Sequence, residues 1–201
     1  MMEWTAFEDQ ARTEGYTCIC GIDEAGRGPL AGPVYAAAVV LRPGQVIEGV
    51  NDSKKLSEKK REALFDTICS QCAAYGIGSA TEKEIDEINI LNATYLAMQR
   101  AVAALPVQPD CALVDGNRAP DLPLEVRTII KGDAQSASIA AASILAKVSR
   151  DPYMLQMAEK YPQYAFEKHK GYGTKLHYER LEQYGISPIH RLSFLKKWMN
   201  R

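Results

Sequence analysis

Short runs of apolar residues, separated by polar turns, mark the chain at several places. Residues 17–23, 34–41, 111–114 and 126–130 have the length and apolar content of β-strands. A turn rich in glycine and proline separates the first two runs, so we expect them to pair as a hairpin. Residues 76–78 are expected to begin a further strand.

Apolar residues at helical spacing fill the stretches between these strands. Ser57 is a suitable N-cap for one helix, with Glu58 in its first turn. A second helix is expected to open with the capping-box pair Thr81 and Glu84, and Pro106 ends it. Before all of these, residues 1–16 form a polar lead-in that could hold a short helix.

A third helix is rich in Ala and Ser, which would let it pack closely on a sheet. We expect Asp133 to cap its start and the helix to run to about Arg150. There Asp151 and Pro152 are expected to break it and to start the next helix, over residues 152–161. Strands that alternate with helices in this way predict an α/β fold with a mixed sheet.

The composition is that of a globular protein. The chain has 201 residues, of which 46% are hydrophobic and 24% are charged. Its longest apolar run, residues 34–41, is too short to span a membrane, and the N-terminus lacks the features of a secretion signal. We therefore expect one cytoplasmic domain over residues 1–201, with no membrane association.

The five cysteines are an odd number, which argues against a disulfide framework. Cys18 with Cys20 and Cys69 with Cys72 could in principle form a four-thiolate zinc site. However, the first pair lies in a predicted strand and the second in a predicted helix, without the turn residues of a zinc knuckle. Buried free thiols are the favoured interpretation.

Charge is distributed unevenly along the chain. Residues 160–201 carry nine Lys and Arg against three Glu, a net +6, so the overall charge of −1 leaves −7 for residues 1–159. A basic C-terminal segment beside an acidic site suits a polyanionic substrate that must also meet metal ions. The alternative is a solvated helix face, and charge alone does not separate the two.

Two adjacent carboxylates, Asp23 and Glu24, lie at the end of the first predicted strand. Burying two such charges without compensation is costly, but Mg²⁺ or Mn²⁺ prefers oxygen ligands and would offset the repulsion. Adjacent strand residues point to opposite faces, so both acids can serve one site only where the strand ends. The alternative is that they simply open an exposed turn.

A dinucleotide-binding interpretation competes for the same glycine-rich turn, because Gly26 and Gly28 fit the loose pattern. Asp23 and Glu24 would then lie beside a pyrophosphate, which is electrostatically unfavourable. The residues that follow, 34–41, predict a strand and not the helix whose N-terminus would hold the phosphate. This interpretation is therefore disfavoured.

Two further acids are candidates for the same site. Asp115 follows the third strand, and sites in α/β sheets form where strand ends meet. Asp151 lies at the junction expected between two helices. Each has an ordinary alternative, since Asp-Gly is a common turn and Asp before Pro is a common N-cap.

Longer motifs along most of the chain resemble ribonuclease HII. They follow one another in the order found in that family, and several are long, so the probability of chance agreement is very small. The motifs are residues 21–33 (GIDEAGRGPLAGP), 51–57 (NDSKKLS), 114–116 (VDG), 131–133 (KGD), 140–151 (AAASILAKVSRD), 169–174 (HKGYGT) and 190–194 (HRLSF).

The resemblance implies an RNase H-like fold, with a mixed five-stranded sheet flanked by helices and additional C-terminal helices. It also implies that Asp23, Glu24, Asp115 and Asp151 are four catalytic, metal-binding carboxylates. All four acids are present, whereas a non-catalytic nucleic-acid-binding module on the same fold would be marked by their replacement.

The resemblance assigns the substrate contacts as well. Gly26, Arg27 and Gly28 would approach the 2′-hydroxyl and phosphate of a ribonucleotide, largely through backbone groups. Tyr172 would pack on the sugar at the RNA–DNA junction, and Lys54 would hold a substrate phosphate.

The activity implied is that of an endonuclease for RNA paired with DNA. It would cut on the 5′ side of a ribonucleotide, even a single one in duplex DNA, and leave a 3′-hydroxyl and a 5′-phosphate. Two Mn²⁺ or Mg²⁺ ions about 4 Å apart would clamp the phosphate. We expect a monomer without the longer C-terminal tail of some relatives and without the extra N-terminal domain of ribonuclease HIII.

Overall fold

A mixed sheet of five strands forms the centre of the molecule. The computed structural model describes residues 4–50 and 56–200. The strands are ordered β3-β2-β1-β4-β5 across the sheet. β1 is antiparallel to β2, which is antiparallel to β3, whereas β1, β4 and β5 run parallel. Their bounds are β1 Ile19–Ala25, β2 Val34–Val40, β3 Ala74–Ala80, β4 Cys111–Asp115 and β5 Glu125–Ile129.

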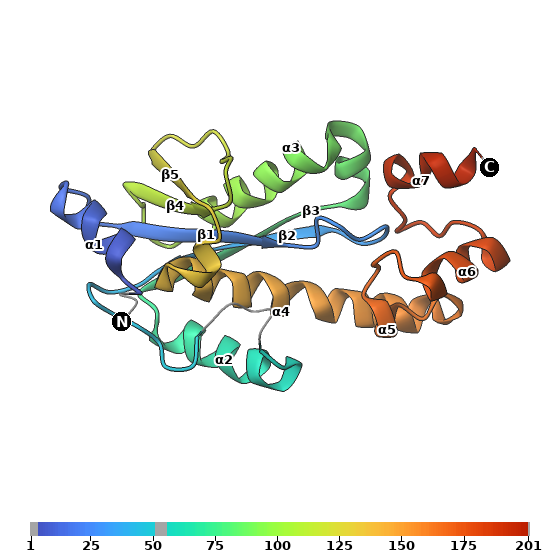
Figure 1. Ribbon diagram of the computed structural model, residues 1–201, viewed down its shortest axis with the longest axis horizontal. Helices are drawn as coiled ribbons and strands as arrows, with labels where there is room; N and C mark the ends of the chain where they lie inside the picture. The colour runs from blue at the N-terminus through green and yellow to red at the C-terminus, as the bar shows by residue number, and fades with distance from the viewer. Residues whose placement is uncertain (1–3, 51–55, 201) are drawn as a thin grey trace.

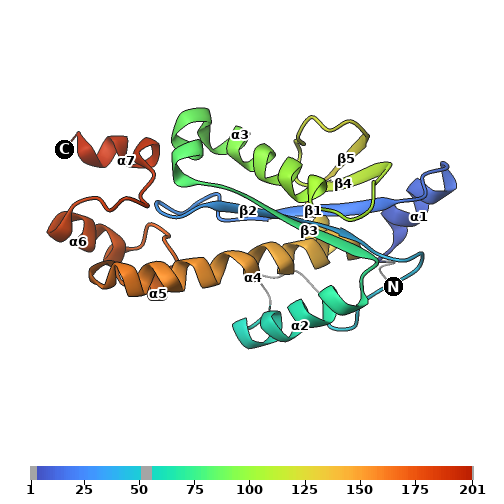
Figure 2. The same cartoon turned by 180° about the vertical axis from the view of Figure 1, so that it is seen from behind.

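Helices cover both faces of the sheet, so the structure has three layers (Figures 1 and 2). α3 lies on one face, and α4 with α2 lies on the other, as both views show. Residues beyond α4 fold into short helices at one end of the molecule. The helix bounds are α1 Ala6–Thr13, α2 Glu58–Gln71, α3 Glu82–Ala103, α4 Ala137–Lys160, α5 Phe166–His169, α6 Lys175–Tyr184 and α7 Leu192–Met199.

Small residues let the helices approach the sheet very closely. A Cβ added at Gly21 of β1 would lie 2.3 Å from a backbone carbon of Ser138 in α4. On the other face, a Cβ at Gly78 of β3 would lie 2.3 Å from the carbonyl oxygen of Ala97 in α3. Since native packing leaves no room for such an atom, these glycines fix the distance between the layers.

Most elements expected from the sequence are confirmed. The mixed five-stranded sheet, the hairpin of β1 and β2 and the strand that contains residues 76–78 are all present. Ser57 caps α2 by accepting from the backbone N–H of Lys60, and Thr81 with Glu84 forms the capping box of α3. All five cysteines are free thiols, as expected.

The prediction for the third helix was wrong at both ends. α4 is one helix that continues through Pro152 to Lys160, so Asp151 lies inside it and does not cap a new one. Its N-cap is Ser136, whose hydroxyl accepts from the N–H of Ile139, whereas Asp133 lies in a separate 3₁₀ turn. Pro152 removes a single backbone hydrogen bond. Beyond it, Met154 is fully buried in a hydrophobic cluster, against which Tyr153 and Met157 pack, and this packing keeps the helix in place.

Within the part of the chain that the structure describes, no helix combines the length and the apolar character needed to cross a lipid bilayer.

Candidate metal centre

Two aspartates meet where neighbouring parallel strands end. Ile22 of β1 pairs in register with Val114 of β4, so the residues that follow, Asp23 and Asp115, lie side by side. The backbone N–H of Gly132 donates to Oδ1 of Asp115 at 2.6 Å, which fixes that carboxylate. Strand ends of this kind are the usual place for sites in α/β sheets.

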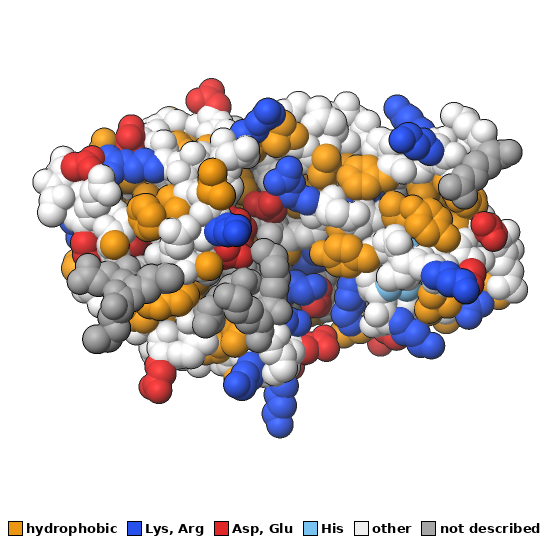
Figure 3. Space-filling view, viewed as in Figure 1, with side chains coloured by type: hydrophobic (Ala, Val, Ile, Leu, Met, Phe, Trp, Pro, Cys, Tyr) orange, Lys and Arg blue, Asp and Glu red, His pale blue; other side chains and the backbone are white. Residues whose placement is uncertain are grey.

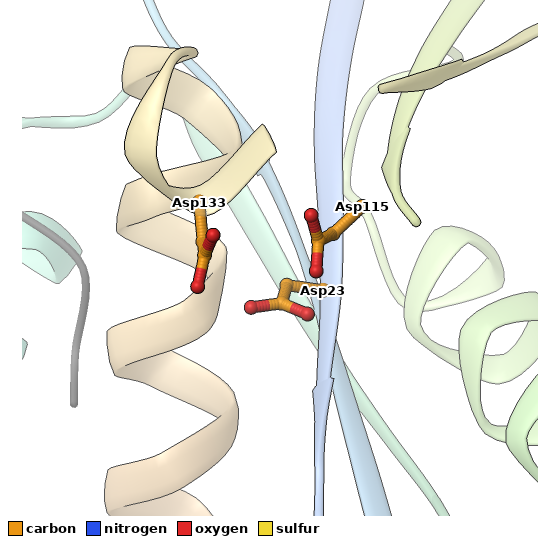
Figure 4. A group of neighbouring side chains, drawn as sticks. All are labelled: Asp23, Asp115 and Asp133. Carbon is orange, nitrogen blue, oxygen red and sulfur yellow. The ribbon is translucent and has the colours of Figure 1, made fainter. Parts of the chain in front are cut away.

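Asp133 supplies a third carboxylate to the same point. It lies in the 3₁₀ turn Gly132–Ala134, between β5 and α4, and only 4% of its surface is exposed. One oxygen from each of Asp23, Asp115 and Asp133 can be chosen such that all three lie within 4.8 Å of one another. Figure 4 shows the three side chains converging from β1, β4 and the turn that precedes α4.

The electrostatics of this cluster favour a bound cation. Burial raises the pKa of Asp23 well above its ordinary value, and the charges of Glu24 and Asp115 raise it further. Hydrogen bonds from the backbone of Glu24 and from the Ser143 side chain oppose this shift. Three carboxylates with only oxygen ligands to offer fit a hard divalent ion such as Mg²⁺ or Mn²⁺, which would offset their repulsion.

Glu24 lines the same cavity without joining the three-carboxylate group. Glu24 lies within β1, next to Asp23, and it is not among the three acids whose oxygens lie within 4.8 Å of one another. A cavity of about 250 Å³ is bounded by both of these acids, by Asp115 and by Lys147 of α4. Nη1 of Arg27 lies 3.3 Å from Oε1 of Glu24 and partly balances its charge.

Asp151 is placed elsewhere. It is mostly buried on α4, where Nζ of Lys147, one turn earlier, lies 2.9 Å from its Oδ1. It lines a neighbouring recess with Val148 and Arg61, and it is not part of the one group of three candidate ligands found among the described residues. The structure thus brings together Asp23 and Asp115 as expected, adds Asp133, and leaves Asp151 paired with Lys147.

Asp133 was missed because its position before a helix made it a natural cap. The sequence did carry a signal, since Asp133 comes shortly after strand β5, while Asp115 is the last residue of β4. Two parallel neighbouring strands that each end near an aspartate would place both acids at one sheet edge. The ordinary capping interpretation was preferred over that one.

The glycine-rich turn forms the rim of the cavity. Gly26 has φ of +96°, a conformation that side-chain-bearing residues rarely adopt. Gly28 and Tyr172 lie across from each other, and a Cβ at Gly28 would be 3.6 Å from Cε1 of Tyr172. The turn leads into strand β2, so the helix N-terminus of a dinucleotide site is not formed there. Lys54 lies outside the described residues.

A buried arginine holds this turn from behind. Arg191 precedes α7 and is fully buried, and its hydrogen bonds to the described residues go to backbone carbonyls. Its guanidinium donates to the carbonyl oxygens of Gly26 at 2.6 Å, Arg27 at 3.0 Å and Gly32 at 2.8 Å. Burial, with a smaller contribution from Arg150, lowers the pKa of Arg191 to about 9, so the group remains charged at neutral pH.

Three basic side chains, Arg27, Arg61 and Lys147, line the acidic cavity together with its carboxylates. In the space-filling view, Lys and Arg stand around a central recess in which acidic side chains are visible (Figure 3). A polyanion that approached this face would meet positive charge first and the carboxylates beneath it.

The sheet order, the flanking helices and the cluster of aspartates define a metal-dependent endonuclease with an RNase H-like fold. A family model for ribonuclease HII matches residues 20–197. The chain belongs to the ribonuclease HII family. A ribonuclease HII from Caldicellulosiruptor bescii is 59% identical over 94% of this chain and 92% of its own length.

Solved structures agree with this assignment. The ribonuclease H2 from Pyrococcus horikoshii OT3 superposes with a TM-score of 0.74 at 29% identity, over 88% of this chain and 93% of its own. A Bst-RNase HIII in complex with Mn²⁺ has a TM-score of 0.62 at 18% identity, over 87% of this chain and 65% of its own, and shows the shared fold.

Proposed function

We propose that the protein is an endoribonuclease that cuts RNA paired with DNA and single ribonucleotides embedded in duplex DNA. The observation that carries this proposal is the cluster of Asp23, Asp115 and Asp133, two of which line a cavity together with the glycine-rich turn and Tyr172. Membership in the ribonuclease HII family supports it. The cut would fall on the 5′ side of the ribonucleotide and leave a 3′-hydroxyl and a 5′-phosphate.

The metal ligands in this proposal are the three clustered aspartates with Glu24 beside them. Asp133 takes the place that the sequence motif gave to Asp151, because it shares the cluster and Asp151 does not. Bound Mn²⁺ or Mg²⁺ ions, two of them in the proposed scheme, would activate water and stabilise the leaving oxygen. Manganese in the RNase HIII relative is compatible with this choice of ion.

The chain's own residues would choose the substrate. Only the 2′-hydroxyl distinguishes RNA from DNA at the cut, so a group must come close enough to sense it. Gly28 is exposed and has no side chain to keep a sugar away from its backbone. Tyr172 is 44% exposed and offers a ring face on which the sugar could pack. Basic residues of the C-terminal segment would contact the duplex backbone, with an affinity that falls as salt rises.

We also propose that residues 1–201 form one catalytic domain and that the protein is a monomer. In this proposal the protein works in the cytoplasm, where its nucleic-acid substrate is found. The C-terminal segment is packed on the rest, since Phe194 contacts both the C-terminal cluster and the core around β2. Sedimentation of the purified chain would test the oligomeric state.

A duplex with one ribonucleotide tests the activity. We expect a nick with Mn²⁺ or Mg²⁺ and none with a chelator. An intact duplex in the presence of metal would refute the proposal.

A matched pair of variants tests the ligand set. Asp133→Asn is expected to reduce cleavage at least about a hundredfold, because it removes a charge from the cluster. Asp151→Asn should have a much smaller effect, since it only breaks the ion pair with Lys147. If Asp151→Asn abolishes cleavage in a folded protein and Asp133→Asn does not, the ligand set suggested by the sequence motif is the correct one.

A further inference from the structure

The three histidines of the chain lie together in the C-terminal segment. His169, His177 and His190 are all buried, at 7%, 0% and 3% exposure. The rings of His169 and His177 stack with their centroids 4.3 Å apart, and the ring of His190 lies 5.1 Å from that of His177. None of them lines the cavity that holds the carboxylates. Their role therefore needs a separate explanation.

The hydrogen bonds of this cluster define which ring nitrogens carry protons. Nδ1 of His177 lies 2.9 Å from the carbonyl oxygen of Tyr172, and a carbonyl can only accept, so this nitrogen donates. In the neutral ring, Nε2 of His177 must then accept, and its partner at 2.9 Å is Nε2 of His190. His190 consequently carries its proton on Nε2.

The second ring nitrogen of His190, Nδ1, completes the chain of donors and acceptors. Its Nδ1 is left as an acceptor and receives the backbone N–H of Ser187 at 2.9 Å and the Ser187 hydroxyl at 2.7 Å. The chain of donors thus runs in one direction, from Ser187 through His190 and His177 to the carbonyl of Tyr172. An extra proton on either ring would set two donors against each other.

His169 holds the backbone N–H of Tyr172. Its backbone carbonyl accepts from the N–H of Tyr172 at 2.8 Å. Its ring Nε2 donates to the carbonyl of Tyr164 at 3.0 Å, and its Nδ1 accepts from the N–H of Gly171 at 3.2 Å. Both backbone groups of Tyr172 are therefore tied to histidines.

The side chain of Tyr172 cannot be fixed by packing to the same degree. It is 44% exposed, and it faces Gly28, which offers no side chain against it. Its position beside the glycine-rich turn depends on its backbone. A shift of about 1 Å in such a group costs substantial catalysis, because the reacting geometry is lost.

We infer that His177 and His190 are positioning residues, which hold Tyr172 beside Gly28 through a proton-ordered chain of neutral imidazoles that begins at Ser187. This inference rests on the proposed role of Tyr172 as the surface on which the sugar packs. Burial supports it, because it lowers the pKa of His177 to about 4 and that of His190 to about 3, so that both rings are neutral at pH 7.

A measurement on the resting protein tests the chain without relying on cleavage. Nitrogen-15 chemical shifts of the histidine rings distinguish the two neutral tautomers and the charged form. We expect His177 protonated at Nδ1, and His169 and His190 protonated at Nε2, at pH 7. A charged ring or the opposite tautomer at His177 would overturn the inference, whatever the protein does to a duplex.

A pair of variants at one position tests the consequence for Tyr172. His177→Asn keeps an N–H that can reach the Tyr172 carbonyl, whereas His177→Phe removes it. Loss of one such bond should lower kcat/KM at a single ribonucleotide about tenfold in His177→Phe, and His177→Asn should recover most of it. Hydrogen exchange at the Tyr172 amide should accelerate in His177→Phe only.

A double-variant cycle separates positioning from general stability. If His177 acts through Tyr172, then His177→Phe should change cleavage less than about twofold in a Tyr172→Ala background. An equal loss in both backgrounds would show that His177 only stabilises the fold and would overturn the inference. A wild-type protein that does not nick the duplex would instead refute the proposed function, and the ring shifts and amide exchange would still decide the hydrogen-bond chain.

Discussion

Replacing Asp23 by Asn should make the metal-free protein more stable while it removes activity. Asp23 is 4% exposed and its pKa is raised by burial and by the charges of Glu24 and Asp115. Asn has nearly the same shape and can still accept the hydrogen bond from the N–H of Glu24 through its side-chain oxygen. The substitution therefore removes a buried charge without leaving a cavity.

The magnitude follows from the distances. Carboxylate oxygens of Asp23 and Asp115 lie within 4.8 Å, and two unit charges at that separation repel by about 3.5 kcal/mol at an effective dielectric constant of about 20. Part of this is already relieved by hydrogen bonds and by proton uptake. We expect Asp23→Asn to raise the free energy of unfolding at pH 8 by roughly 1 to 3 kcal/mol.

The gain should depend on pH with a defined sign. The folded-state pKa of Asp23 lies above its unfolded value of 3.8, so the folded state holds the proton more tightly. The contribution of Asp23 to wild-type stability is then fully present in acid and is lost as pH rises through the folded pKa of this group. The advantage of the Asn variant should be largest at pH 8 and should shrink as pH falls toward the ordinary value for an aspartate.

Urea unfolding in the presence of a chelator, repeated between pH 5 and pH 8, measures this difference. Asp66→Asn, an exposed aspartate on α2, is a matched control and should change stability by less than about 0.5 kcal/mol. Adding Mg²⁺ should stabilise the wild type and leave the Asp23 variant almost unchanged. An Asn variant that is destabilised, or stabilised equally at every pH, would refute the reasoning.

Three further outcomes are expected. His177 and His190 have folded pKa values of about 4 and about 3, below the unfolded value of 6.5, so their contribution to stability is full above pH 6.5 and is lost in acid. In urea unfolding, the free energy of unfolding of the wild type should therefore fall by about 3 to 4 kcal/mol from these two groups between pH 7 and pH 5. If the loss between these pH values differs by less than about 1 kcal/mol between the wild type and His177→Asn, the result contradicts this prediction. Gly28→Ala should leave the thermal midpoint unchanged, because its nearest new contact, Tyr172, is 3.6 Å away, yet it should lower cleavage more than about tenfold by keeping the sugar off the backbone. Gly21→Ala should lower the free energy of unfolding by at least about 3 kcal/mol in the same assay, since the new Cβ would overlap the backbone of α4. A Gly21→Ala variant as stable as the wild type would rule out rigid packing of α4 on β1.

Local signals in the sequence were sufficient for most of the fold. Capping at Ser57 and Thr81 depends on residues three positions apart, and the strands depend on short apolar runs, so both can be recognised without tertiary information. The continuity of α4 through Pro152 could not be recognised in this way, because it depends on the burial of Met154 in the C-terminal hydrophobic cluster. That packing involves segments far away in the sequence.

The carboxylates of the site could likewise be predicted only in part from the sequence. Asp23 and Asp115 were identified from strand ends, and the parallel register of β1 and β4 brings them together. Asp133 was assigned to a cap because its distance to Asp115 depends on β5, on a left-handed residue at Lys131 and on the turn that follows. The histidine chain was not foreseen either, since the three residues are spread over 22 positions and meet only after α5, α6 and the segment before α7 fold together.

The hydrogen bonds from Arg191 to the glycine-rich turn determine which way the peptide groups of that turn point. All described peptide bonds are trans, so each N–H points opposite to the carbonyl of the same peptide unit. The carbonyls of Gly26 and Arg27 are directed to Arg191, and the N–H groups of Arg27 and Gly28 are consequently directed away from it. Among the described residues, neither of these N–H groups has a hydrogen-bond acceptor, and the two carbonyls are engaged by Arg191. This strip of backbone therefore attracts electron-rich atoms and repels cations. An electron-rich group that enters the cavity is therefore attracted to the glycine-rich turn, whereas the carboxylates that line the same cavity attract cations.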